Sequence, residues 1–390
     1  MSNLAKVHSI AAPKWVANGR WNRVVAPLLL SQAELLKLFA MILILAPFFG
    51  LLGVIFPLFM HILSIQRVGG DSAEKHGIST LSSSRLGGVS IAVIMFAYVV
   101  YNAVGGVEMP FNATEGFGWV AVILMAFIGL SEDLKADLLS PSNRLSAQIV
   151  IMGVALFVAD AYVPDSINLP VIDYLLIIPM LGWLLCTLFA VGFVNAFNMA
   201  DGANGLIPGI AFAAFFVFAS ETGRIFEVGY MSACAIFLVF NVISGRFFLG
   251  DMGSYGLGAA IALYGLRFVS EGTFSASFLA CLLAYPCLDL LMSIFRRLRE
   301  GRSPFSPDNE HLHNRLFRQM RRCVDRPVLA NSLTGLCLSG FTSGIALIGY
   351  LQTWWPLSSN GWLFLFILQV VLYLSAYWLT GLVGKSGAVR

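Results

Sequence analysis

Eleven apolar stretches follow one another along the chain, at about 38–63, 87–106, 115–131, 145–163, 172–194, 205–220, 228–245, 253–270, 274–295, 329–351 and 361–383. A helix needs about 20 apolar residues to cross roughly 30 Å of hydrocarbon. Inside lipid, a helix also satisfies its own backbone polar groups. The pattern therefore predicts an all-α, polytopic integral membrane protein with about eleven transmembrane helices.

Polar residues capable of chemistry gather in the odd-numbered connections between these stretches. They are Lys75-His76 with Arg85 to Gly88, Glu132-Asp133, Asn195 to Leu206, Gly250 to Ser254, and His311 with His313. The even-numbered connections hold almost none. Because alternate connections emerge on the same side of a membrane, we expect five polar segments to converge on one face. This layout indicates an enzyme that works at the boundary between lipid and water.

Charge is sparse and unevenly placed. Apolar residues make up 58% of the chain and charged residues 12%, whereas about a quarter of a soluble domain is charged. Of 24 Lys and Arg residues, 17 lie in the odd connections and the C-terminal tail, and only Arg224 and Arg267 lie in the even connections. The positive-inside rule therefore predicts that the odd connections and the C-terminus are cytoplasmic, and parity places the N-terminus outside.

The first 37 residues carry five Lys and Arg residues against one acid, Glu34. Basic residues before a first span favour its retention inside. Either the charge elsewhere overrides them, or residues 21–36 lie along the membrane interface as an amphipathic helix. No short apolar core with a cleavage site is present, so no removable signal peptide is predicted. The expected organisation is a basic segment, 1–37, followed by a single multi-span membrane domain, 38–390.

The six cysteines include no C-x-x-C pair, and five of them lie in apolar stretches. We expect them to be small buried hydrophobes, not metal ligands or disulfides.

The segment from Phe248 to Ser254 places the carboxylate of Asp251 between glycines, just before an apolar helix. Glycine lets a phosphate approach closely because no Cβ obstructs it, and the first N–H groups of the helix point to the same place. Mg²⁺ prefers one or two carboxylates together with substrate phosphates, which makes Asp251 a candidate ligand. Taken alone, a helix cap with a glycine turn explains the segment equally well.

Asn195, Asn198 and Asp201 recur every three residues, so they share one face of a helix end before Gly202 and Gly205 break the helix. A polar stripe on an apolar membrane helix is costly without partners, which favours a functional role. The alternative is a loop, since loops use the same residue types for their turns.

Glu132 and Asp133 end the third stretch. Adjacent carboxylates could share a cation, or could split their pKa values to give one base. The alternative is a solvated loop at the interface. Asp289, within the ninth stretch, is expected to face the bundle interior with a partner and to be structural or supporting.

His311 and His313 lie in a connection that holds nine arginines between 296 and 326. Imidazoles and cations suit a pyrophosphate. Contact with anionic lipid is the alternative, and it would explain the arginines but not the histidines. Lys75 and His76 are interpreted in the same way.

Together these segments resemble the polyprenyl-phosphate N-acetylhexosamine-1-phosphate transferase family, that is, bacterial glycosyl transferase family 4. The resemblance spans about residues 65–320 and keeps the order of the motifs. The family's Asp-Asp pair corresponds to Glu132-Asp133, its R-L-x-x-Q to Arg144 to Gln148, its N-x-x-N-x-x-D-G-x-x-G-L to Asn195 to Leu206, its F-x-G-D-x-G-S to Phe248 to Ser254, and its H-x-H-H to His311 to Asn314.

The resemblance implies a role for each matched residue. Glu132, Asp133 and Asp251 would be catalytic, with the adjacent pair serving the lipid phosphate and the metal and one of the two acting as base. Asp251 and Asp201 would bind Mg²⁺, or Mn²⁺ in its place. The substrate-binding residues would be Lys75, His76, Arg144, Asn195, Asn198, Asp201, Asn241, Phe248, His311 and His313, of which Phe248 and Asn241 match uracil contacts and the two histidines match diphosphate contacts.

The chain departs from the family pattern at four positions, which are Glu132 for Asp, Asn204 for a frequent Asp, Asn314 for the last His, and Ser84 for a Pro. The longer side chain of Glu132 weakens the case for an in-line nucleophile at that position.

The implied activity begins with a UDP-N-acetylhexosamine on the cytoplasmic side of a bacterial inner membrane. Its sugar-1-phosphate would pass to undecaprenyl phosphate with release of UMP, as the first membrane step of a polysaccharide of the O-antigen, common antigen or teichoic acid type. Because both reactants are anionic, a cation must screen their approach. The expected partners are these two substrates and the bilayer, not nucleic acid. The sugar, the pathway, single or double displacement, and a homodimer are left open.

Two alternatives remain. A secondary transporter also has ten to twelve spans, but it binds its substrate near the midplane of the membrane, whereas these motifs lie at the ends of the stretches. A phospho-MurNAc-pentapeptide transferase of the same family would need three adjacent histidines, which this chain lacks.

Overall fold

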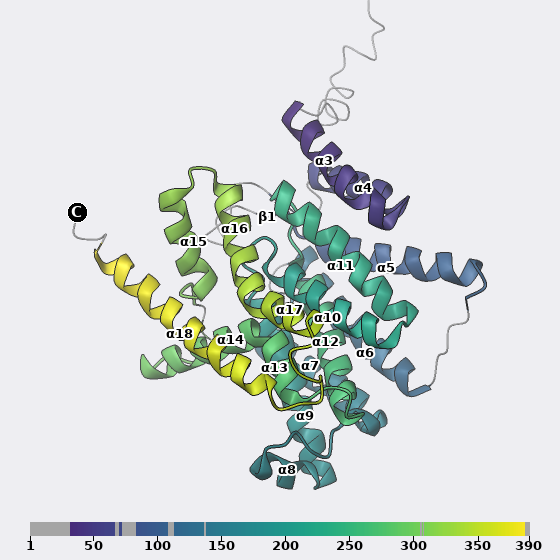
Figure 1. Ribbon diagram of the computed structural model, residues 1–390, viewed down its shortest axis with the longest axis vertical. Coiled ribbons are helices and arrows are strands. Elements are labelled where there is room, and N and C mark those ends of the chain that lie inside the picture. Colours follow the sequence, from purple (N-terminus) through teal and green to yellow (C-terminus); the bar gives the residue numbers. More distant parts are fainter. Residues whose placement is uncertain are drawn as a thin grey trace, which may run out of the picture.

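The computed structural model describes residues 32–66, 70–71, 83–107, 113–135, 138–304, 306 and 308–386. Within these residues the protein is helical apart from two short strands (Figure 1). The elements are α3 (Gln32–Phe49), α4 (Leu52–Gln66), β1 (Gly70–Asp71), β2 (Ser83–Ser84), α5 (Gly87–Val104), α6 (Ala113–Leu134), α7 (Pro141–Val158), η2 (Asp160–Tyr162), α8 (Pro170–Leu176), α9 (Pro179–Met199), α10 (Leu206–Thr222), α11 (Ile225–Ser244), α12 (Gly250–Ser270), α13 (Ala276–Leu282), α14 (Ala284–Arg299), α15 (Leu312–Cys323), α16 (Pro327–Ser339), η3 (Gly340–Gly344), α17 (Ile345–Leu351) and α18 (Trp362–Ser386). Lys75 and His76 lie outside the described residues, as does most of the predicted segment 1–37.

The predicted class, an all-α polytopic membrane protein, is confirmed. Every predicted apolar stretch carries helix. In the described part of the chain, seven helices are long and apolar enough to cross a membrane, or eight if the bent pair α13 and α14 is one span. The count of eleven stays a prediction, because α10 has only 17 residues and the first stretch is divided into α3 and α4.

Helix α12 forms the centre of the bundle. It packs against α6 and α9 and also contacts α5 and α10, and most of its side chains are buried. Small residues such as Gly256, Gly258 and Ala259 let neighbouring backbones approach closely, which is how membrane helices associate. The first turn of α12, which carries Asp251, therefore lies amid the ends of several helices.

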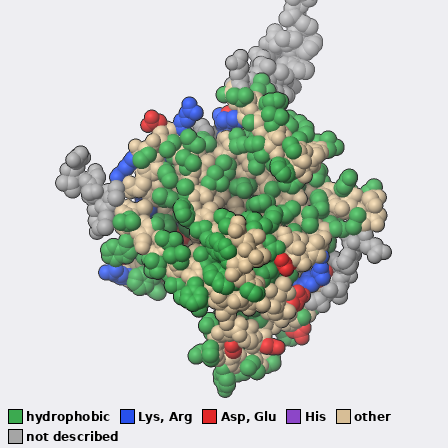
Figure 2. All heavy atoms as spheres, viewed as in Figure 1, with side chains coloured by type: hydrophobic (Ala, Val, Ile, Leu, Met, Phe, Trp, Pro, Cys, Tyr) green, Lys and Arg blue, Asp and Glu red, His purple; other side chains and the backbone are tan. Residues whose placement is uncertain are grey.

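The outer surfaces of the peripheral helices are apolar. Large exposed side chains include Phe96, Phe157 and Phe364, and hydrophobic side chains cover much of the face in Figure 2, with charged groups toward its edges. A lipid-facing surface has this composition, because charge is costly within hydrocarbon.

Strand β2 ties the start of α5 to the start of α12. Ser84 forms a parallel bridge with Phe247, and the N–H groups of Gly87 and Gly88 donate to the carbonyls of Phe248 and Leu249 at 2.9 and 2.7 Å. A Cβ on Gly88 would overlap the backbone of Gly253. The two glycine-containing motifs, far apart in sequence, are therefore one structural unit.

The orientation across the membrane is predicted from charge and can be tested at two exposed serines. Ser303 lies in the arginine-rich connection and Ser358 in the turn before α18. We expect Ser303→Cys to be labelled only from the cytoplasm and Ser358→Cys only from outside, because short loops rich in arginine stay inside. Labelling of Ser303→Cys by an impermeant reagent in intact cells would contradict the arrangement.

Candidate active site

Asp251, in the first turn of α12, is held by Asn198 of the Asn195 to Leu206 motif. Its Oδ1 accepts a hydrogen bond of 2.8 Å from Nδ2 of Asn198, near the end of α9. The same Asn198 nitrogen lies 2.8 Å from Oγ of Ser254. The amide of Asn198 therefore fixes the carboxylate and the hydroxyl of the F-x-G-D-x-G-S segment in one place.

Asp133, at the end of α6, caps the N-terminus of α12. Its Oδ1 accepts the N–H of Asp251 at 2.9 Å, and its Oδ2 accepts the N–H of Met252 at 2.8 Å. A carboxylate is favourable there because the first N–H groups of a helix have no partner within it and carry partial positive charge. Gly250 has φ of +75°, and a Cβ there would overlap the carbonyl of Arg85, so this junction requires glycine.

Asp201, in the loop between α9 and α10, is the third carboxylate of the site. Burial, together with the nearby charges of Asp251 and Asp133, raises its pKa to about 8. Burial and the neighbouring negative charges therefore disfavour the ionised form of this carboxyl group. Carboxylates that repel one another in this way gain from an added cation.

The two histidines are held by residues of α14. Nδ1 of His311 lies 2.6 Å from Oδ2 of Asp289. The other oxygen of Asp289, Oδ1, accepts the N–H of Leu312 at 3.0 Å and the hydroxyl of Tyr373 at 2.8 Å. The expected supporting role of Asp289 is consistent with these bonds. With Nδ1 oriented by a carboxylate, the Nε2 atom of His311 is left for a ligand.

His313 stacks on His311, with ring centroids 5.3 Å apart. Nδ1 of His313 lies 3.1 Å from the hydroxyl of Tyr285. Burial lowers the pKa of His313 to about 4, so the ring is neutral at physiological pH and offers a hydrogen bond but no charge. A Cβ on Gly202 would overlap this ring, which accounts for the glycine after Asp201.

Asp201, Asp251 and the two histidines line one polar pocket of about 210 Å³, whereas Asp133 is not among its lining residues. Of the predicted site residues, the pocket contains Asn198, Asp201, Asn241, Phe248, Asp251, His311 and His313. Both ends of the Asn241 amide bind the backbone. Its Oδ1 accepts the N–H of Gly205 at 2.7 Å, and its Nδ2 donates to the carbonyl of Phe247 at 2.8 Å. It therefore fixes the Gly202–Gly205 turn against the Phe248 segment.

The structure places three other predicted residues beside this pocket, in a separate group with Gln148. Glu132 pairs with Arg144 at 3.6 Å and accepts the N–H of Leu139 at 3.0 Å. Asn195 donates to Gln148 at 2.7 Å. Because Glu132 is adjacent to Asp133, this group adjoins the pocket through α6 without lining it.

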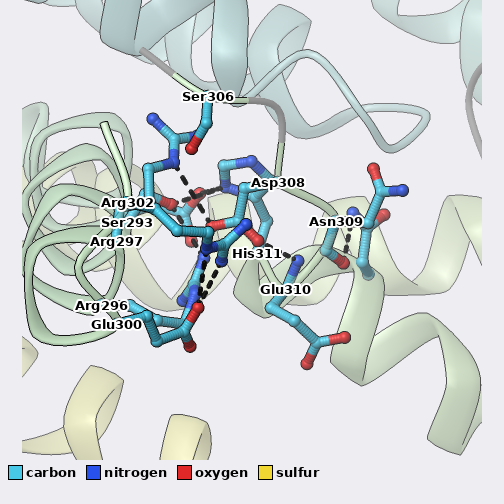
Figure 3. A network of polar contacts seen from close by, with 12 residues as sticks. Ser293, Arg296, Arg297, Glu300, Arg302, Ser306, Asp308, Asn309, Glu310 and His311 are labelled. Atoms are coloured by element: carbon cyan, nitrogen blue, oxygen red, sulfur yellow. Dashed lines mark hydrogen bonds and ion pairs between the residues drawn. The ribbon is translucent and has the colours of Figure 1, made fainter. Parts of the chain in front are cut away.

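The arginines and the histidines of their shared connection face different cavities. Arg296 and Arg297 bind Asp308 (Figure 3). Arg318 pairs with Glu310 at 3.1 Å. Five arginines line a larger cavity of about 850 Å³ bordered by α14, α15 and α18, namely Arg296, Arg299, Arg315, Arg318 and Arg322. The histidines line the polar pocket instead, so contact with lipid could account for the arginines alone, as the sequence indicated.

Sequence reasoning missed five polar residues of the pocket as site residues. They are Arg85, Asp308, Asn309, Asn314 and Asn331. Arg85 is the one Arg or Lys that lines the pocket in the described part of the chain, and its place before Gly87-Gly88 was the signal that could have identified it. Asn331 accepts the N–H of Asn204 at 3.0 Å, a contact that no motif spacing indicates.

The pocket suits a cation that shares its ligands with a substrate. Among the described residues, no three His, Cys, Asp or Glu side chains form a ligand set by themselves. Mg²⁺ usually takes one or two carboxylates and completes its shell with water and phosphate oxygens. Asp251 and Asp201 meet that requirement, while both oxygens of Asp133 already accept N–H groups.

Comparison with known proteins covers this same region. Residues 115–269 match the model of glycosyl transferase family 4. The chain is 31% identical over 209 residues to the undecaprenyl-phosphate alpha-N-acetylglucosaminyl 1-phosphate transferase of Escherichia coli K12, covering 50% of this chain and 56% of that protein. The protein of the same name from Yersinia pestis is 28% identical over 253 residues, which cover 60% of this chain and 65% of that protein. The one from Thermotoga maritima is 32% identical over 130 residues, which cover 33% of this chain and 41% of that protein.

The chain spans about half the length of the curated relatives it matches. The matched segment contains Asp133, Asn198, Asp201 and Asp251, whereas the two histidines lie beyond it. Over residues 115–269, which carry Asp201 and Asp251 of the pocket, the chain is similar to glycosyl transferase family 4.

Proposed function

We propose that this protein transfers an N-acetylhexosamine-1-phosphate from a UDP-sugar to undecaprenyl phosphate and releases UMP. The observation that carries the proposal is the polar pocket in which Asp251, Asp201 and His311 meet at the ends of membrane helices. Relatives named as undecaprenyl-phosphate alpha-N-acetylglucosaminyl 1-phosphate transferases support the same reaction. The proposed setting is the cytoplasmic face of a bacterial inner membrane.

The donor would bind with its diphosphate between the histidines and Arg85. A guanidinium can form paired hydrogen bonds with phosphate, and Arg85 lines the pocket together with His311 and His313. The neutral imidazole of His313 would contribute a hydrogen bond. Phe248 offers an aromatic surface in the same pocket, which suits the flat uracil ring.

Asp251 and Asp201 would hold Mg²⁺, with Mn²⁺ as the substitute. The bound ion would screen the charges of two phosphates that must come together. Asn198 would keep the carboxylate of Asp251 oriented, and Asp133 would keep the N-terminus of α12 aimed at the pocket. Both roles follow from the hydrogen bonds that these residues make.

The acceptor would approach from the lipid. Helix α7, whose Arg144 pairs with Glu132, exposes apolar side chains such as Val150 and Phe157, a surface suited to a polyprenyl chain. Glu132 and Arg144 lie on this side, next to Asp133. One of the Glu132-Asp133 pair would act as base, or the pair would steer the lipid phosphate.

The depth of the site favours this enzyme over a transporter. Asp251 is in the first turn of α12, Asp133 is the second-last residue of α6, and Asp201 follows the end of α9. A transporter would hold such groups near the midplane, often at broken helices. The phosphate-transfer reaction needs them at the membrane surface, where a water-soluble nucleotide can reach them.

The identity of the donor can be determined directly. Purified protein would be incubated with undecaprenyl phosphate, Mg²⁺ and one radiolabelled donor at a time, including UDP-N-acetylglucosamine, UDP-N-acetylgalactosamine and UDP-MurNAc-pentapeptide. We expect a UDP-N-acetylhexosamine to label the lipid. Labelling by the pentapeptide donor alone would show the phospho-MurNAc-pentapeptide transferase activity instead.

A further inference from the structure

A second pocket, of about 220 Å³, lies at the opposite end of the helices that form the candidate active site. Helix α6 contributes Glu115 from its start, whereas Asp133 is at its end. Helix α12 contributes Arg267 from its last turn, whereas Asp251 is in its first. Helix α11 contributes Glu227 from its first turn. The proposed transferase chemistry does not use Glu115, Arg267 or Glu227.

Two arginines are fixed in this pocket by one carboxylate. Oε1 of Glu115 accepts from Arg224 at 2.5 Å and from Arg267 at 2.8 Å. Arg267 also donates to Glu271 at 2.7 Å. Guanidinium groups held in place in this way form a rim that can bind a phosphate without first losing side-chain freedom.

Glu227 lines the same pocket and lacks a partner for one of its oxygens. The residue is 1% exposed, and its Oε2 has no hydrogen-bond partner among the described residues. A buried carboxylate oxygen without a donor is costly. A ligand that brings a cationic donor into the pocket would remove this cost.

The walls of the pocket are aromatic and continue into an apolar groove. Trp119 and Phe226 line the pocket, and their ring centroids are 4.7 Å apart. Trp119 also stacks on Tyr230, with ring centroids 5.6 Å apart. Trp119 and Phe226 also line a neighbouring apolar cavity of about 410 Å³, which is bordered by α5, α6, α11 and α12 and reaches Met252. A charged pocket that opens into an apolar groove matches a lipid, with a head and a chain.

We propose that this pocket binds a zwitterionic membrane lipid whose head carries a phosphate and a primary ammonium. The phosphate binds at the rim of Arg224 and Arg267, and the ammonium donates to Glu227 between the aromatic side chains, which also attract a cation. The acyl chain lies in the apolar groove. A head that carried only negative charge would leave Glu227 without a partner.

The experiment compares two short-chain lipids, one with a primary ammonium and one in which the same nitrogen is a neutral amide. Phosphatidylethanolamine and its N-acetylated derivative, which keeps the phosphate and loses the cation, would be titrated by calorimetry into the full chain in detergent. We expect phosphatidylethanolamine to bind about tenfold more tightly or better, because one charge-assisted hydrogen bond is at stake. Equal affinities would overturn the proposal.

Two variants locate the site. Glu227→Gln should remove the preference for the amine and leave the affinity for the N-acetylated lipid unchanged. Arg224→Gln, at the half-exposed rim, should weaken both lipids. An amine preference that survives in Glu227→Gln would place the lipid elsewhere. If Glu227→Gln does not fold, the comparison of the two lipids on the unmodified chain still decides. The site does not depend on the proposed transferase activity, so either can fail alone.

Discussion

Replacing Asp251 by Asn should abolish nearly all turnover and leave the protein folded in the membrane. The exchange keeps the shape of the side chain and removes the charge that would hold Mg²⁺ between the reacting phosphates. The hydrogen bond from Asn198 to Oδ1 of Asp251 can persist with an amide oxygen in the same place. Folding should therefore be preserved, and excess Mg²⁺ should rescue the variant poorly.

The control for this prediction is Asp165→Asn, the same exchange at an exposed aspartate between η2 and α8. Initial rates of lipid labelling would be measured for both variants, with thermal unfolding to check the fold. Asp165→Asn should match the unmodified protein. If Asp251→Asn kept more than about a tenth of the rate, a loss below roughly 1.4 kcal/mol, Asp251 would not be a principal metal ligand.

Replacing Asp133 by Asn should lower both turnover and stability. Both carboxylate oxygens accept backbone N–H groups of α12, whereas an amide offers one acceptor and turns a donor toward the other N–H. An unpaired buried N–H costs about 1–3 kcal/mol. The turn of α12 that loses this cap carries Asp251, and we expect it to shift. Turnover should therefore fall by about tenfold or more, since about 1.4 kcal/mol is a factor of ten.

Asp173→Asn is the matched control, because Asp173 also accepts a backbone N–H, that of Ile167 at 2.7 Å, but lies in α8, away from the pocket. It should leave turnover unchanged. The two effects of Asp133→Asn separate two roles. Lower turnover at full stability would indicate that Asp133 acts as the base, whereas full turnover and full stability would refute the capping role.

Much of the fold was predictable because apolar length determines it. Apart from α15, which lies between two stretches, the α-helices from α5 to α18 fall where the stretches predict them, since a membrane helix must be apolar along its length. Bends within the stretches were not predictable. The angle of 81° between α13 and α14 and the break at Gly50 between α3 and α4 both lie inside continuous apolar stretches, so hydropathy does not report them.

The sequence predicted seven of the residues that line the pocket, and few of their contacts. Motif spacing brought Asp251, Asn198 and Asp201 together, because each motif stands at a helix end on the same face. Spacing could not show that Asp133 caps α12, or that the arginines pair with Asp308 and Glu310 and leave Arg85 in the pocket. Those contacts join segments separated by long stretches of sequence, and only the tertiary structure sets them.

The central claim is that a phosphate travels with the sugar, and the nucleotide product tests it most directly. Purified protein would be supplied with the labelled UDP-sugar, undecaprenyl phosphate and Mg²⁺, and the nucleotide released would be identified by chromatography. We predict UMP, formed only when both the lipid phosphate and the metal are present, because the bond between the two phosphates of the donor is cut. Release of UDP, with a single phosphate on the lipid product, would contradict the account even if the sugar reached the lipid.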